Sequence, residues 1–404
     1  MRRMRDGKTQ RRLGPLADGV RRSVWCALVV AAMLALGMGL SAAAQASGEA
    51  AAQARGSATV HGGGGTATQA ESAAVTPVVS PAMGEEYARP HELVDVGGGR
   101  KMNLFCMGTG TPTVVFDSGL SDWSSIWALV QPGVARVTRA CSYDRAGMGY
   151  SDFSAAPRTP VSIDEDLHTL LHNAKIAMPV VLVGHSLGGF NMKLYAALYP
   201  KEVAGLVLVD PSEERSYERT VAAVDARYGA AVMARISLDD IAETTMAITH
   251  YSQCAEMAAR KDLDPESDVY KMCTDPVRPP LGPAIAAARE KIQVTGAYQE
   301  TQASELAYSI YGDPRGDAIY ARLFAGQPFG ARPLIVLTHS IYDAKDTDAA
   351  AEFFAWNTLH NQTARLSRRG VNRIVPGTHH NIEVDKPQAI VDAVTEVVKR
   401  VRAQ

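Results

Sequence analysis

Continuous apolar runs that end in polar turns are the feature that most constrains the fold of this chain. The runs 180–183 and 203–209 show no alternation of polar and apolar side chains. Such runs are typical of parallel strands that are covered on both faces. Helical patterns separate them along the chain, so the sequence predicts an α/β protein with a mostly parallel sheet flanked by helices.

The order of the elements can be predicted from the same rhythm. Strands are expected at 102–107, 112–116, 137–143, 180–183, 203–209, 333–338 and 372–376. Helices are expected at 163–176 (with Ser162 as N-cap), 187–198 and 387–402. The long segment 211–330 lacks a strong strand and looks helical. It predicts a cap inserted between the strands at 203–209 and 333–338. Ligands bind at the carboxyl edge of open α/β sheets, so the cap is expected over that edge.

The first 46 residues have the layout of a secretory signal peptide. Eight Lys and Arg residues, Arg21 and Arg22 among them, precede an apolar run over 24–40, and Ala44-Gln45-Ala46 fits a cleavage site. An uncleaved membrane anchor is the alternative, because about 17 apolar residues is the lower limit for a bilayer span. Residues 47–88 are rich in Ala, Gly, Ser and Thr and are predicted to be a disordered tether. Residues 89–404 are expected to form the folded domain.

Charge and cysteine content agree with export to the periplasm or the outside of the cell. Without residues 1–46 the chain keeps 33 basic and 41 acidic side chains, a net charge of −8, which argues against a nucleic-acid partner. Four cysteines remain, as expected for disulfides in an oxidising compartment. From the expected strand positions we favour the pairs Cys106–Cys141 and Cys254–Cys273. No paired C-x-x-C pattern indicates a metal site, and no cofactor signature is present.

The turn after the strand at 180–183 carries the chemistry. It reads Gly184-His185-Ser186-Leu187-Gly188, a G-x-S-x-G motif between a buried strand and a helix. This is the context of a nucleophile elbow, in which small residues allow a sharp turn that raises Ser186 above the sheet. The Leu187 amide then lies at a helix N-terminus, where it can stabilise an oxyanion. On these residues the chain resembles the α/β-hydrolase superfamily, specifically its serine esterase, lipase and aminopeptidase-like members.

The resemblance implies the remaining site residues. The loop Asp117-Ser118-Gly119-Leu120 follows the third strand, where the family supplies a second oxyanion donor, which implies the Leu120 amide. The segment 377–387 is similar to the family pattern G-H-x-I-x-x-D-x-P, whose spacing selects His380 rather than His379 as the general base. By the same resemblance, Asp144 and Arg145 are expected to be structural.

The triad acid has two candidates. Asp343 follows the strand at 333–338, the seventh strand of the family fold, after which many relatives carry the acid in a G-x-x-D pattern. Here the glycine of that pattern is missing, and Asp343 lies about one position late. Asp210 ends the strand 203–209, the other position from which a carboxylate can reach the histidine. We favour Asp210 and keep Asp343 as the alternative.

Together these residues predict a serine hydrolase that cleaves carboxylic esters through an acyl-enzyme. Its partner is a small-molecule ester or amide substrate, and it contacts a membrane only if the N-terminal segment is retained. An aminopeptidase or amidase of the same fold is the alternative within enzymes, and it would need an acidic pocket for a substrate amine. A non-catalytic binding protein that keeps the fold is the alternative outside enzymes.

Overall fold

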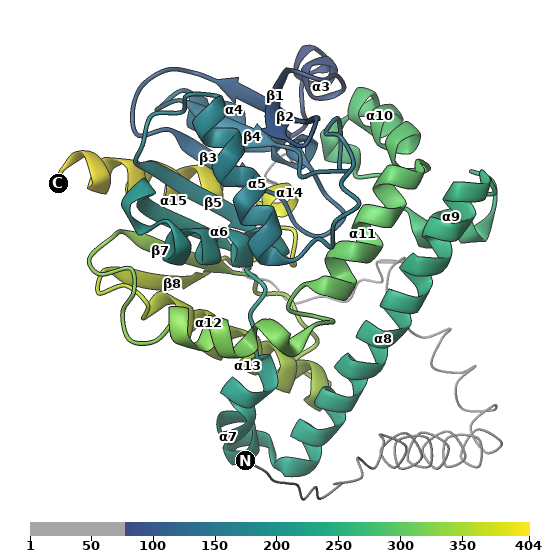
Figure 1. The fold of residues 1–404 in the computed structure, drawn as a ribbon. Coiled ribbons are helices and arrows are strands. Elements are labelled where there is room, and N and C mark those ends of the chain that lie inside the picture. The colour runs from purple at the N-terminus through teal and green to yellow at the C-terminus, as the bar shows by residue number, and fades with distance from the viewer. Residues whose placement is uncertain (1–76) are drawn as a thin grey trace, which may run out of the picture. The chain divides into compact units, whose positions relative to one another are not determined.

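An eight-stranded sheet organises the computed structural model, which describes residues 77–404 (Figure 1). The strand order is β1-β2-β4-β3-β5-β6-β7-β8. Among the described strands, β2 alone runs opposite to its neighbours, and all pairs from β4 to β8 are parallel. The strands are β1 (Glu92–Gly97), β2 (Arg100–Met107), β3 (Val114–Asp117), β4 (Ala140–Tyr143), β5 (Val180–His185), β6 (Val203–Val209), β7 (Leu334–Thr338) and β8 (Gly370–Ile374). The predicted α/β architecture with a mostly parallel sheet is confirmed, and β1 is a strand that the sequence analysis missed.

Helices cover both faces of the sheet. On one face lie α5 (Pro160–Asn173), α6 (Ser186–Leu198) and α13 (Thr347–Ala364); on the other lie α4 (Gln131–Ala135), the 3₁₀ helix η1 (Ser124–Leu129) and α15 (Pro387–Arg402). Alternate residues of β5 enter the two cores, since Val181 and Val183 pack on the α15 side and Val180 and Leu182 on the α5 side. Both faces are therefore buried, which explains the continuous apolar runs.

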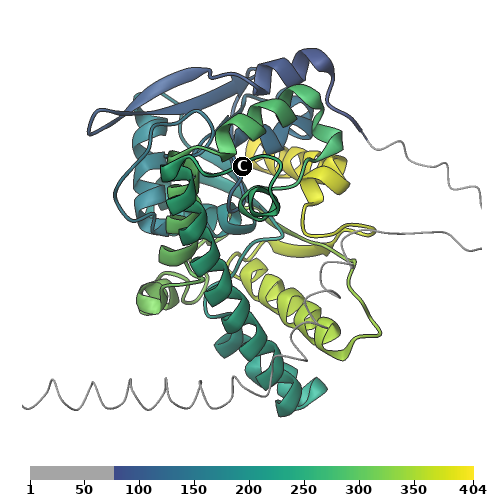
Figure 2. The ribbon, with the colours of Figure 1, turned by 90° about the vertical axis from the view of Figure 1, so that its right-hand side faces the viewer.

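The segment between β6 and β7 is helical. Its longest element, α8, runs from α7 up to α9 (Figures 1 and 2). The helices are α7 (Ser216–Tyr228), α8 (Ala230–Arg260), α9 (Asp268–Cys273), η3 (Pro279–Leu281), α10 (Pro283–Gln293), α11 (Gly296–Tyr308), η4 (Pro314–Gly316) and α12 (Asp317–Leu323). We refer to residues 211–330 as the cap. The remaining described helices are η2 (Pro200–Glu202) and α14 (Ile382–Asp385). Within residues 77–404 no helix is long and apolar enough to cross a membrane.

Two expectations about element boundaries need correction. The tether predicted over 47–88 is wrong for its last residues, because α3 (Pro81–Tyr87) is a helix capped by Ser80, with Val79 and Tyr87 buried. The rest of that prediction, over 47–76, lies outside the described residues. The N-cap of α5 is Thr159, whose side chain accepts from the Ser162 amide, so the helix begins before Ser162. The predicted signal peptide lies outside the described residues.

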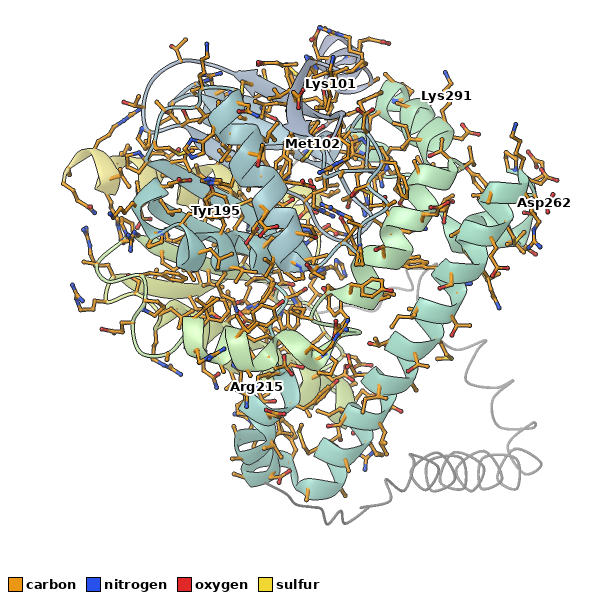
Figure 3. The ribbon with its side chains drawn as sticks, in the orientation of Figure 1. Lys101, Met102, Tyr195, Arg215, Asp262 and Lys291 are labelled. Carbon is orange, nitrogen blue, oxygen red and sulfur yellow. A yellow bond between two sulfur atoms is a disulfide. The ribbon has the colours of Figure 1, made fainter. Side chains whose placement is uncertain are left out.

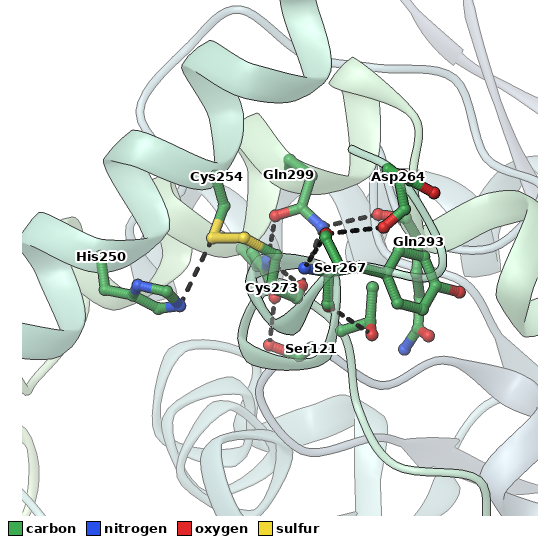
Figure 4. Close-up of a disulfide and its surroundings, with 11 residues drawn as sticks. Ser121, His250, Cys254, Asp264, Ser267, Cys273, Gln293 and Gln299 are labelled. Atoms are coloured by element: carbon green, nitrogen blue, oxygen red, sulfur yellow. Dashed lines mark hydrogen bonds between the residues drawn. A yellow bond between two sulfur atoms is a disulfide. The ribbon is translucent and has the colours of Figure 1, made fainter. Parts of the chain in front are cut away.

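Both favoured disulfides are present. Cys106 and Cys141 are direct cross-strand partners in the β2–β4 pair. Cys254 and Cys273 join α8 to α9 (Figure 4). The Cys273 carbonyl accepts hydrogen bonds from Gln299 (2.9 Å) and Gln302 (3.2 Å) of α11, so the bridge is tied to the centre of the cap.

A buried ion network fixes the chain where it leaves β6. Lys193 of α6 is fully buried, and its ammonium donates to Glu213 (2.6 Å) and Glu214 (2.7 Å). Arg219 of α7 binds the same two carboxylates. The network joins α6 to the start of the cap and holds in place the short segment 210–212, which enters the site described below.

We predict that Lys193→Met lowers the free energy of unfolding by about 3–5 kcal/mol, because it leaves two buried carboxylates with Arg219 as the one remaining cation of the network. Urea unfolding measures the change. The matched control is Lys201→Met, at an exposed lysine, which should shift stability by no more than about 0.5 kcal/mol. Equal stabilities of the two variants would contradict this role of the network.

Candidate active site

Ser186 lies at a sharp turn between β5 and α6. It is the first residue of α6 and has a left-handed backbone (φ 51°), a conformation that costs free energy outside glycine. A Cβ atom at Gly184 would lie 2.2 Å from the Gly188 carbonyl oxygen, and one at Gly188 would lie 2.4 Å from the Ser118 oxygen. Side chains are therefore excluded at both positions, as a nucleophile elbow requires.

Asp210 lies at the end of the neighbouring strand β6 and is completely buried. Its Oδ2 accepts from His380 Nδ1 (2.6 Å) and His339 Nδ1 (2.8 Å). Its Oδ1 accepts from the His339 amide (3.0 Å) and from Trp356 Nε1 (3.1 Å). Burial opposes ionisation of this carboxyl, but the hydrogen bonds from His339 and His380 outweigh it and hold the Asp210 pKa well below its usual value.

The structure brings Asp210 and His380 together, and it places the alternative acid elsewhere. Asp343 is exposed, and its carboxylate accepts from the Lys345 amide (2.9 Å) within its own turn. His379, the neighbour of His380, is exposed and contacts Asp385. The His380 side chain is 45% exposed, so its free ring nitrogen is accessible to a ligand.

The hydroxyl of Ser186 faces two residues that the sequence analysis did not single out. Ser186 Oγ lies 3.3 Å from Ser212 Oγ, which in turn contacts the Tyr311 hydroxyl at 2.5 Å. Tyr311 comes from the cap, and burial raises its pKa. Ser212 follows Asp210 by two residues, so one turn after β6 supplies both groups.

The loop that holds Leu120 is positioned by Arg145. This arginine is buried and donates to the carbonyls of Ser118 (2.6 Å) and Gly119 (2.8 Å), and to Asp117 and Glu305. A trans peptide points its N–H away from its C=O, so fixing the Gly119 carbonyl also fixes the direction of the Leu120 amide. The contacts of Arg145 thus fix the loop that carries a predicted oxyanion donor.

His185 and Glu383 form a second buried layer beneath His380. His185 Nε2 donates to the His380 carbonyl (3.0 Å), and His185 Nδ1 lies 3.5 Å from Glu383 Oε1. Burial lowers the His185 pKa to about 3 and raises the Glu383 pKa to about 8. Both groups are therefore neutral near pH 7. A protonated Glu383 faces the acceptor nitrogen of His185, and the pair supports the backbone of the predicted base.

One of these residues, His339, could have been found from the sequence. His339 directly follows β7, so it lies at the same carboxyl edge as Asp210. Glu383 lies three residues after His380, but nothing in the local pattern signals its burial. Trp356 and Tyr311 come from helical regions distant in sequence, and no sequence signal places them beside Asp210 and Ser186.

The comparisons with known proteins agree with this architecture. Residues 112–239 match the family model described as alpha/beta hydrolase fold. A putative lipase from Acinetobacter baumannii AYE superposes with a TM-score of 0.52 at 16% identity, covering 79% of this chain and 94% of that one. The enol-lactonase from Burkholderia xenovorans LB400 gives 0.50 at 15% identity, covering 76% and 99%. The chain therefore has the α/β-hydrolase fold.

Curated relatives match over short segments. The human (lyso)-N-acylphosphatidylethanolamine lipase is 32% identical over 104 residues, which is 25% of this chain and 30% of that protein. Protein YqjL of Bacillus subtilis is 32% identical over 105 residues, 26% of this chain and 42% of that protein. The match thus spans less than half of the length of either relative.

The buried Glu383 gives a prediction about pH. Its folded-state pKa of about 8 exceeds the ordinary value of 4.5, so the folded state retains a proton that the unfolded state loses. The wild type therefore loses stability as the pH rises from 4.5 to 8, whereas Glu383→Gln, which cannot ionise, lacks this loss. Urea unfolding at pH 5 and pH 8.5 measures this. The free energy of unfolding of Glu383→Gln, relative to that of the wild type, should be higher at pH 8.5 than at pH 5.

Glu85→Gln, at an exposed glutamate of α3, is the control and should follow the wild type at both pH values. If Glu383→Gln and the wild type change in parallel, Glu383 is not held neutral in the folded protein.

Proposed function

We propose that this protein is an exported serine hydrolase that cleaves carboxylic esters through Ser186, His380 and Asp210. The observation that carries the proposal is the hydrogen bond between Asp210 Oδ2 and His380 Nδ1, made at the sheet edge where Ser186 occupies a left-handed elbow. A buried, ionised carboxylate on Nδ1 fixes the histidine tautomer and leaves Nε2 as the proton acceptor.

The proposed reaction has two halves. The Ser186 hydroxyl leaves its contact with Ser212 and forms a hydrogen bond to His380. His380 takes the Ser186 proton while Oγ attacks the ester carbonyl. The Leu120 and Leu187 amides stabilise the oxyanion that forms. His380 then protonates the departing alcohol, which leaves an acyl group on Ser186. Water, deprotonated by His380, attacks this acyl group, and the acid is released with Ser186 regenerated.

Fluorophosphonate labelling tests the assignment of the nucleophile and the acid. The wild type should label, and Ser186→Ala should not. Asp210→Asn should slow labelling by about 10⁴-fold, because it loses the tautomer and the charge that support His380. Asp343→Asn is the matched control, since it alters the alternative acid, and it should label at the wild-type rate.

Labelling that survives Asp210→Asn but is lost in Asp343→Asn would move the acid to Asp343. Absence of labelling in folded wild-type protein would favour the non-catalytic binding protein.

A second candidate, an aminopeptidase or amidase, is favoured by the position of four carboxylates. A cavity of about 240 Å³ between α7, α8 and α13 is lined by Asp239, Asp240, Glu243 and Glu352, together with Trp356. Trp356 also binds Asp210. Asp240 acts electrostatically on Tyr311, whose hydroxyl contacts the Ser212 hydroxyl next to Ser186. Negative charge in this cavity would suit a substrate with an ammonium group.

Substrate charge separates the two candidates. If a substrate amine binds these carboxylates, Asp240→Asn should raise the KM for alanine p-nitroanilide about 10- to 100-fold, as expected for a charge-assisted hydrogen bond of about 1.5–3 kcal/mol. The KM for neutral p-nitrophenyl butyrate should stay unchanged. Hydrolysis of the butyrate alone would support the esterase.

Export is part of the proposal. Two disulfides in the described chain suit an oxidising compartment, and the segment 1–46 has the pattern of a signal peptide. Protein recovered from the periplasm of a Gram-negative host should begin at Ser47 by N-terminal sequencing. Membrane-bound protein that begins at Met1 would indicate an anchor instead.

A further inference from the structure

Two histidines and a glutamate converge on the surface formed by α5 and η2. His168 and His172 are one helical turn apart on α5, so their side chains share one face. His168 Nδ1 lies 3.2 Å from Glu202 Oε2, and His172 Nε2 lies 3.0 Å from Glu202 Oε1. One ligand atom from each residue lies within 4.8 Å of the other two.

These separations fit a tetrahedral metal ion. Zinc binds histidine nitrogen and carboxylate oxygen at about 2.0–2.1 Å, so two ligand atoms of a tetrahedral site are about 3.3 Å apart. Each histidine nitrogen lies close to that distance from one oxygen of Glu202, His168 from Oε2 and His172 from Oε1. Two imidazoles and a carboxylate are also ligands that zinc accepts, and histidines at i and i+4 of a helix are a known zinc-binding arrangement.

Neighbouring aromatic residues hold the glutamate and one histidine in place. Tyr195, labelled in Figure 3, donates its hydroxyl to Glu202 Oε2 (2.7 Å). The Tyr199 ring stacks on His168, with centroids 4.1 Å apart and planes at 8°. The side chains are 33% (His168), 50% (His172) and 18% (Glu202) exposed, so an ion can enter from solvent.

The cluster is remote from the proposed catalytic residues. Glu202 directly precedes β6, whereas Asp210 directly follows it. Eight residues of extended chain span roughly 25 Å, so the cluster and the triad lie at opposite ends of one strand. An ion here would link α5 to the turn between α6 and β6, and it would not take part in the reaction.

We propose that His168, His172 and Glu202 form a binding site for a divalent transition metal ion such as zinc, which cross-links α5 to η2. Two neutral imidazoles and one carboxylate supply three ligands, and water supplies the fourth. Any proton held between the glutamate and a histidine is released to solvent when the ion binds.

Titration calorimetry with zinc chloride on the untagged full chain tests the proposal. The wild type should bind zinc, and the double variant H168N/H172N should lose that binding. Tyr195→Phe, which removes the hydrogen bond to the ligating carboxylate, should weaken binding about 10- to 100-fold. Zinc should raise the melting temperature of the wild type but not of the double variant, whose circular dichroism reports that it is folded.

A second group of possible ligands makes His339→Gln the informative control. Asp210, His339 and His380 also bring ligand atoms within 4.8 Å of one another, and zinc bound there would block His380. The proposal expects His339→Gln to retain zinc binding. Zinc binding that persists in H168N/H172N, that is lost in His339→Gln, or that is absent from the wild type would overturn it.

Discussion

The buried carboxylate of Asp210 is the group on which the site geometry depends. An ionised carboxylate inside the protein is stable only when its oxygens accept hydrogen bonds, and this one receives four. The donors come from three regions: His339 after β7, Trp356 on α13 and His380 before α14. The hydrogen bonds to the Asp210 carboxylate therefore fix the ends of β6 and β7, helix α13 and the predicted base relative to one another.

A second set of buried charges joins the cap to the sheet. Arg145, after β4, binds Glu305 of α11 and the carbonyls of the Leu120 loop. Two residues beyond Leu120, buried Asp122 pairs with Arg278 and Arg289 of the cap at 2.8 Å each. Burial opposes ionisation of Asp122, but the two arginines lower its pKa to about 2. The loop with the predicted oxyanion donor is thus held between the sheet and the cap.

The positions of most strands along the chain and the elbow could be predicted because each depends on local sequence. Local patterns predict these features: the apolar run 180–183 predicts a buried strand, and the glycines at 184 and 188 predict a sharp turn. The aspartate after 203–209 lies at a strand end from which it can reach the histidine. The residues around Asp210 and Ser186 could not all be predicted. Trp356 reaches Asp210, and Tyr311 reaches Ser212 beside Ser186, through tertiary packing of distant segments. The neutral state of Glu383 is a consequence of burial that a single sequence does not reveal. Conversely, α3 was assigned to the tether because composition outweighed the Ser80 cap and the apolar contacts of Val79 and Tyr87.

A crystal structure of the protein after reaction with diethyl p-nitrophenyl phosphate would test the central claim most directly. The account predicts a diethylphosphoryl group on Ser186 Oγ, with its phosphoryl oxygen within hydrogen-bond distance of the Leu120 and Leu187 amides. His380 would remain bound to Asp210 through Nδ1. A phosphoryl group on another residue, an oxygen directed away from both amides, or a His380 ring bound to Asp343 would contradict it.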